Sequence, residues 1–168
     1  RAPAGLMGRA YLALGSNIEP ARHLRSALAA LRERFGDVHV SPVYRTPAIG
    51  FDGDDFLNAA ALIDSELDPY ALNDWLHALE DAHGRDRSGP RFGPRPLDID
   101  IVFYDDLTLD GPGHLQIPRD ELKHAFVLKP LADLAPDYVH PRLGRSLAAL
   151  WASSGLTIGP VVDLASTS

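Results

Sequence analysis

The stretch RFGPRPLDIDIV, residues 91–102, places two carboxylates two residues apart in an apolar, β-branched run. Such a run predicts a strand, on which alternate side chains point to the same face. Asp98 and Asp100 therefore share one face, while Ile99 and Ile101 face a core. Placing two carboxylates side by side costs free energy unless a positive charge lies between them. We therefore expect the pair to bind one or two Mg²⁺ ions. The alternative is a solvated strand edge.

Arginines lie immediately before this strand. Arg85, Arg87, Arg91 and Arg95 fall in a segment that is interrupted by glycine and proline, which predicts a loop. Guanidinium groups match phosphate oxygens in geometry and in charge. An acid pair beside such a loop is what phosphoryl transfer requires, because cations must hold and neutralise a polyphosphate. A loop of solvated surface arginines is the alternative.

The composition describes a globular chain and excludes several classes of protein. The length of 168 residues fits one domain, 1–168, and the net charge of −7 argues against a general nucleic-acid partner. No apolar run is long enough to span a membrane, and no segment has the pattern of a signal peptide. Cysteine is absent, which suits the cytoplasm and excludes thiolate metal sites. Because the chain begins with Arg1, we expect Met7 to be the native start and residues 1–6 to be an addition.

The periodicity of apolar residues predicts an α+β fold. Strands are predicted at 9–14, 38–44, 56–63 and 97–104, and helices at 20–35 and 69–83. This βαββαβ order is typical of the ferredoxin-like core, an antiparallel sheet with two helices on one face. A hairpin within 107–117 and helices near 127–134 and 146–153 are expected to cover the other face.

Several motifs then occur in a characteristic order along the chain. They are YLALGSN at 11–17, SPVYRTP at 41–47, FLNAA at 56–60, GPRPLDID at 93–100, FVLKPL at 126–131 and His140-Pro141. With them the chain, from Tyr11 to about Pro141, resembles the 6-hydroxymethyl-7,8-dihydropterin pyrophosphokinase family of folate biosynthesis. The resemblance implies transfer of pyrophosphate from ATP to the hydroxymethyl oxygen of the reduced pterin, leaving AMP.

The same resemblance implies a set of site residues. Two Mg²⁺ ions would be held by Asp98 and Asp100, and Arg85 and Arg95 would act on the phosphates during transfer. The implied ATP site comprises His77, Glu80, Arg85, Arg87, Arg95, Ile101, Arg119 and His124. The implied pterin site comprises Thr46, Pro47, Ile49, Phe56, Asn58, Phe92 and Phe126.

The residue types suit these roles, although simpler interpretations exist. A flat heteroaromatic ring favours a pocket with apolar faces and a few polar groups at its edge. Phe56 and Phe126 could equally be core residues. Asn58 in mid-strand is harder to explain in that way, because a buried amide requires partners. Glu80 could be a solvated acid on a helix.

One segment departs from the family pattern. The family has Pro-His and, a few residues later, Arg before the Phe, whereas this chain has Pro118, Arg119 in the His position and His124 in the Arg position. Arg119 can bind phosphate as His can. His124 is mostly neutral near pH 7, so we expect weaker ATP binding from this position.

Three functional hypotheses remain open at this point. The first is a monomeric pterin pyrophosphokinase whose only partners are its small-molecule substrates. The second is a paralogue that acts on a related pterin, and the third is a nucleotide- or pterin-binding module without turnover. The presence of both aspartates and both key arginines favours catalysis.

Overall fold

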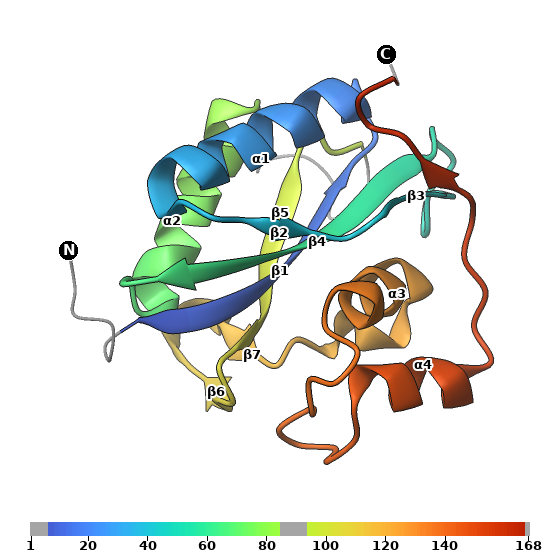
Figure 1. The fold of residues 1–168 in the computed structure, drawn as a ribbon. Coiled ribbons are helices and arrows are strands. Elements are labelled where there is room, and N and C mark those ends of the chain that lie inside the picture. Colours follow the sequence, from blue (N-terminus) through green and yellow to red (C-terminus); the bar gives the residue numbers. More distant parts are fainter. Residues whose placement is uncertain (1–6, 85–93, 167–168) are drawn as a thin grey trace.

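A six-stranded antiparallel sheet forms the centre of the molecule (Figure 1). The computed structural model describes residues 7–84 and 94–166. The strands follow the order β5-β1-β4-β3-β8, and β2 also pairs with β4. These strands are β1 (Gly8–Ser16), β2 (His39–Val40), β3 (Val43–Thr46), β4 (Phe56–Ser65), β5 (Asp98–Tyr104) and β8 (Val161–Val162).

Helices cover both faces of this sheet (Figure 1). The α-helices are α1 (Pro20–Phe35), α2 (Pro69–Ala82), α3 (Ala125–Leu134) and α4 (Leu147–Ser154). The short 3₁₀ helices are η2 (Pro112–His114) and η3 (Asp120–Lys123), and a small second sheet pairs β6 (Leu109–Asp110) with β7 (Gln116–Ile117). In the ranges that the structure describes, no helix has the length and apolar character needed to cross a bilayer.

The main core lies between the sheet and helices α1 and α2. Alternation along β1 and β5 directs Leu12, Leu14, Ile99 and Ile101 to this side, as the sequence predicts. Helical spacing directs the leucines of both helices against them; these are Leu24, Leu28, Leu31, Leu72 and Leu76. The burial of Ile99 and Ile101 fixes which face of β5 carries Asp98 and Asp100.

A second core lies on the opposite face, where α3 packs on β4, β3 and β1. Tyr11, Phe103 and Leu131 are buried here, and Tyr11 meets Phe103 edge-to-face. A register shift interrupts the pairing of β1 with β5, because Leu12 opposes Ile101 and Tyr11 opposes Phe103. Val102 is thus the additional residue of a β-bulge in β5. Val102 is buried in this second core and, with Asp98 and Asp100, lines a cavity on the same face of the sheet.

Most predicted elements are confirmed, and two differ. The continuous strand predicted at 38–44 is wrong, because β2 and β3 are separated at Ser41-Pro42. Proline has no N–H for the ladder, and the Ser41 hydroxyl instead accepts the N–H of Ala60 at 2.8 Å. The short hairpin predicted within 107–117 is confirmed by the antiparallel pairing of β6 with β7, but its expected position is wrong, because Leu109, Leu115 and Ile117 pack with the main core and not on the other face. The mixed α/β character and the antiparallel sheet agree with the prediction.

Candidate active site

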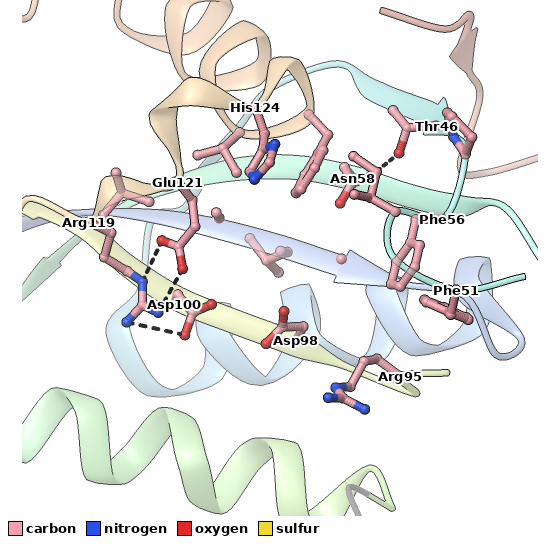
Figure 2. Close-up of a pocket in the computed structure, with 18 residues that line it drawn as sticks. Thr46, Phe51, Phe56, Asn58, Arg95, Asp98, Asp100, Arg119, Glu121 and His124 are labelled. Atoms are coloured by element: carbon pink, nitrogen blue, oxygen red, sulfur yellow. Dashed lines mark hydrogen bonds and ion pairs between the residues drawn. The ribbon is translucent and has the colours of Figure 1, made fainter. Parts of the chain in front are cut away.

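A cavity of about 380 Å³ lies between the sheet and the segment that joins η3 to α3 (Figure 2). Residues from β1, β3, β4, β5, η3 and α3 and from the loop before β4 meet in it. Its lining consists of Ala13, Leu14, Gly15, Thr46, Pro47, Ile49, Phe51, Phe56, Asn58, Arg95, Asp98, Asp100, Val102, Arg119, Glu121, His124, Phe126 and Val127. The Arg119, Glu121 and Asp100 side chains lie toward one end of it, and the Phe51 and Phe56 rings lie toward the other (Figure 2).

The charged end contains the two aspartates of β5. Asp98 and Asp100 both line the cavity, so the prediction that they share a face is confirmed. Burial, followed by the charge of Asp98, raises the pKa of Asp100 well above its usual range, although Arg119 opposes the shift. An added positive charge is therefore favourable here, because it relieves the repulsion between the two carboxylates.

The donor set at this end fits Mg²⁺. Among the residues of 7–84 and 94–166, no three His, Cys, Asp or Glu side chains converge into a metal-binding cluster. A site with two carboxylates suits an ion that keeps several water ligands and takes others from substrate phosphates. The Arg119 guanidinium, which lies 3.9 Å from Asp100, shows that a cation is accommodated beside the pair.

Arg119 is fixed by contacts with three neighbours. Its backbone N–H donates to the Val102 carbonyl at 3.2 Å, at the bulge. Its Nε and Nη2 donate to the Glu121 carboxylate at 2.7 and 2.8 Å, and its Nη1 lies 3.9 Å from Asp100 Oδ1. The hydrogen bonds to Glu121 raise the pKa of Arg119 further, so the guanidinium stays charged. Burial works against ionisation of Glu121, but the bonds from Arg119 keep its pKa below the usual range.

Arg95 lines the cavity from the segment before β5, on the side of Asp98 away from Arg119 (Figure 2). Its backbone is held by Asn17, whose side-chain Oδ1 accepts the Arg95 N–H at 2.7 Å and whose own N–H donates to the Arg95 carbonyl at 3.0 Å. The Asn17 amide also donates to the Asp54 carbonyl at 3.2 Å. This buried asparagine, the first residue after β1, thus connects the loop before β4 to the segment that carries Arg95.

The other end of the cavity combines an amide with aromatic rings. Asn58 is 6% exposed, and its side-chain N–H donates to the Thr46 hydroxyl at 2.5 Å. Phe51 and Phe56 meet edge-to-face with centroids 6.3 Å apart. A Cβ at Gly15 would lie 2.7 Å from Asn58 Oδ1, so glycine is required for this amide to approach the strand.

Phe126 projects into the same cavity from the first turn of α3, beside His124. The two rings stack with centroids 5.0 Å apart and an angle of 13° between their planes. His124 thereby contributes a flat surface as well as its ring nitrogens. The structure brings together Thr46, Pro47, Ile49, Phe56, Asn58, Arg95, Asp98, Asp100, Arg119, His124 and Phe126 of the predicted set.

Three predicted residues lie elsewhere. His77 is exposed on α2, and Ile101 is buried in the main core with its side chain directed away from the cavity. Glu80 is 2% exposed, so the interpretation of a solvated helix acid is wrong. Its Oε2 accepts the N–H of Ile99 at 3.0 Å, which ties α2 to the backbone between the two aspartates. Arg85, Arg87 and Phe92 fall outside the described residues.

The sequence interpretation missed Phe51, Gly15 and the role of Glu121. Glu121 follows Arg119 by two residues, and this spacing was the available signal for a local ion pair. Phe51 lies in a glycine-containing loop, where no periodicity marks it as part of a pocket. Gly15 is recognised only when the position of Asn58 across the β1–β4 ladder is known.

Comparison with known proteins identifies the family. The family model described as 7,8-dihydro-6-hydroxymethylpterin-pyrophosphokinase (HPPK) matches residues 11–136. The chain belongs to this family. The HPPK match spans β1 through α3 and so includes all the elements that line the cavity.

Similar proteins carry the matching enzyme name. The 2-amino-4-hydroxy-6-hydroxymethyldihydropteridine pyrophosphokinase of Pseudomonas aeruginosa is 43% identical over 154 residues, which cover 88% of this chain and 93% of that protein. The protein of the same name from Methylorubrum extorquens is 44% identical over 137 residues, which cover 79% of this chain and 86% of the relative.

Solved structures agree on the fold. A crystal structure of Plasmodium falciparum HPPK-DHPS with pterin and p-hydroxybenzoate superimposes with a TM-score of 0.71 at 16% sequence identity. The superposition covers 87% of this chain but only 43% of that chain, so the present protein spans less than half of the Plasmodium chain.

Proposed function

We propose that this protein transfers the pyrophosphoryl group of ATP to the hydroxymethyl oxygen of 6-hydroxymethyl-7,8-dihydropterin, releasing AMP, as a step of folate biosynthesis. Membership of the HPPK family supports this activity. The observation that carries it is one cavity that combines a carboxylate pair and the Arg119 guanidinium at one end with an amide and aromatic rings at the other. These two ends suit a metal-bound triphosphate and a flat polar ring, respectively.

The aromatic end would bind the pterin. Phe56 and Phe126 would contact the ring faces, while Asn58 would read the polar edge by hydrogen bonds. The bond from Asn58 to Thr46 fixes the orientation of the amide, so its oxygen is directed before the ligand arrives. Pro47 and Ile49 line the same end, and Ile49 is 51% exposed, which places an apolar side chain at the entrance.

The charged end would bind the triphosphate. Asp98 and Asp100 would hold Mg²⁺, two ions in our proposal, which when bound supplies positive charge to the phosphate oxygens. Arg95 and Arg119 both line the cavity, on either side of the acid pair, and provide guanidinium groups that match phosphate geometry. Glu80 would act indirectly, because its bond to the Ile99 N–H fixes the strand between the two aspartates.

Catalysis in this arrangement rests on positioning. The pterin hydroxymethyl oxygen must approach the β-phosphorus in line, and the walls of one cavity hold both reactants without a covalent intermediate on the protein. Arg95 is suited to act on the phosphates during transfer, because Asn17 hydrogen-bonds both its backbone N–H and its carbonyl. Arg85, Arg87 and Phe92 keep their predicted roles as proposals.

A direct assay distinguishes the three hypotheses. The protein is mixed with ATP, Mg²⁺ and 6-hydroxymethyl-7,8-dihydropterin, and AMP is quantified by chromatography, with a reaction lacking pterin as the control. AMP that forms only with this pterin supports the proposal. ATP binding without AMP formation indicates a binding module, and turnover with a different pterin alone indicates a paralogue.

The same proposal includes the fold layout, the oligomeric state and the cellular location of the protein. The sheet order, with the two long helices α1 and α2 on one face, supports a ferredoxin-like layout. We further propose that the chain acts as a single-domain monomer in the cytoplasm with small-molecule partners only. The absence of cysteine from the sequence is compatible with that location.

A further inference from the structure

The Arg119 guanidinium lies between the carboxylates of Glu121 and Asp100 (Figure 2). It makes two short hydrogen bonds to Glu121, at 2.7 and 2.8 Å, and a longer contact of 3.9 Å to Asp100. The Arg119 side chain is 27% exposed, and its backbone is tied to Val102 at the bulge. A cation of the protein itself is thus held against the acid pair, with Glu121 as its stronger partner.

This position has opposite consequences for a free metal ion and for a nucleotide. A free divalent cation that approaches Asp100 meets a positive charge already in contact with the same oxygen, so its binding is opposed. A polyphosphate brings oxygens that a guanidinium binds well, and the same phosphates complete the coordination shell of the metal. Phosphate therefore relieves the competition that Arg119 imposes on the metal.

We propose that Arg119 is a tethered counter-ion that opposes binding of free divalent cations at Asp98 and Asp100 and couples metal binding to nucleotide binding. Glu121 is the positioning residue that holds the guanidinium in place. This inference rests on the proposed function, because it assumes that the cavity takes a metal-bound nucleotide.

The coupling has a thermodynamic signature. Metal should raise the affinity for nucleotide by the same factor as nucleotide raises the affinity for metal, because linkage is reciprocal. Removal of Arg119 should reduce this factor from both directions. Free metal would bind more tightly without the competing cation, and metal-bound nucleotide would bind more weakly without the guanidinium.

The test is titration calorimetry on the full chain with Mn²⁺ alone and with Mn²⁺ plus α,β-methylene ATP, which cannot release AMP. Arg119→Ala is expected to tighten binding of free Mn²⁺ by about tenfold and to weaken binding of the metal–nucleotide complex by about tenfold. Lys123→Ala is the matched control. Lys123 lies in the same η3 segment, is 66% exposed and pairs with Asp120 rather than with the acid pair, so it removes the same charge outside the cavity. Both of its affinities should stay within about twofold of the wild type.

The role of Glu121 is tested by a double-mutant cycle. Glu121→Gln should weaken metal–nucleotide binding by about fivefold in the wild type and by less than about twofold in the Arg119→Ala background, because the glutamate acts through the arginine. A merely structural role would lower the thermal midpoint equally in both backgrounds without this difference in affinity. Arg119→Gln provides a second variant that retains most of the side-chain volume if alanine disturbs the fold.

Unchanged or weaker binding of free Mn²⁺ in both folded Arg119 variants would overturn the proposal. An equal effect of Lys123→Ala would also overturn it, because net charge alone would then explain the result. Failure of the proposed function looks different, since wild-type protein would then form no AMP whatever the metal affinities of the variants.

Discussion

Glu80 offers the sharpest test of how the second helix supports the acid pair. Its carboxylate is 2% exposed and accepts the N–H of Ile99 at 3.0 Å, between Asp98 and Asp100. Glu80→Ala removes this bond and leaves a buried backbone N–H without that acceptor, which costs about 1–3 kcal/mol. The space left by the side chain adds about 1 kcal/mol, so we expect a loss of about 3 kcal/mol in the free energy of unfolding.

Urea unfolding followed by far-UV circular dichroism measures this loss. With a slope of about 2 kcal/mol per M, the midpoint of Glu80→Ala should fall by about 1.5 M. Glu80→Gln keeps an oxygen that can accept the same N–H, so its loss should be about 1 kcal/mol or less. Glu33→Ala, which removes an exposed glutamate from α1, should stay within about 0.5 kcal/mol of the wild type. Equal midpoints for wild type and Glu80→Ala, or equal losses for the alanine and glutamine variants, would refute the reasoning.

Other changes at the two ends of the cavity have distinct expected outcomes. Asp100→Ala should abolish AMP formation with an unchanged circular dichroism spectrum, and a near-normal rate would show that the metal assignment is wrong. Asp100→Asn should raise the metal-free free energy of unfolding at neutral pH, because the folded state raises the pKa of Asp100 and so disfavours its charge. That gain should shrink as the pH falls below the raised pKa and disappear near the ordinary carboxyl pKa, where the group is neutral in both the folded and the unfolded protein; a gain independent of pH in thermal melts would contradict this origin. Thr46→Val should weaken pterin binding by about tenfold in calorimetry, since it frees the Asn58 amide from the bond that orients it, whereas an unchanged affinity would remove Thr46 from the account.

Much of the fold follows from local patterns in the sequence. The helices predicted at 20–35 and 69–83 agree with α1 and α2 within a residue, because leucine spacing and an initial proline specify amphipathic helices locally. β8 could not be predicted, since two valines form a strand only where the edge of β3 is available to them. The break between β2 and β3 at Ser41-Pro42 depends on a tertiary contact. The Ser41 hydroxyl accepts the N–H of Ala60 on β4, in place of a backbone carbonyl of the ladder.

Some features of the site also follow from local sequence patterns, and others do not. The shared face of Asp98 and Asp100 follows from strand alternation alone, and the structure confirms it. The burial of Glu80 and the position of Arg119 do not follow from local patterns. The burial of Glu80 depends on the approach of α2 to β5. The position of Arg119 depends on the bulge at Val102, whose carbonyl accepts the Arg119 N–H. Contacts of this kind are decided by packing between distant segments, which composition and periodicity do not encode.

The most direct test of the central claim is a crystal structure of the protein with α,β-methylene ATP, Mg²⁺ and 6-hydroxymethyl-7,8-dihydropterin bound together. Metal density is expected on the Asp98 and Asp100 carboxylates, in contact with the triphosphate, and the pterin ring is expected beside Asn58 between Phe56 and Phe126. Metal and phosphate bound away from these aspartates, or a pterin outside the cavity, would contradict that claim.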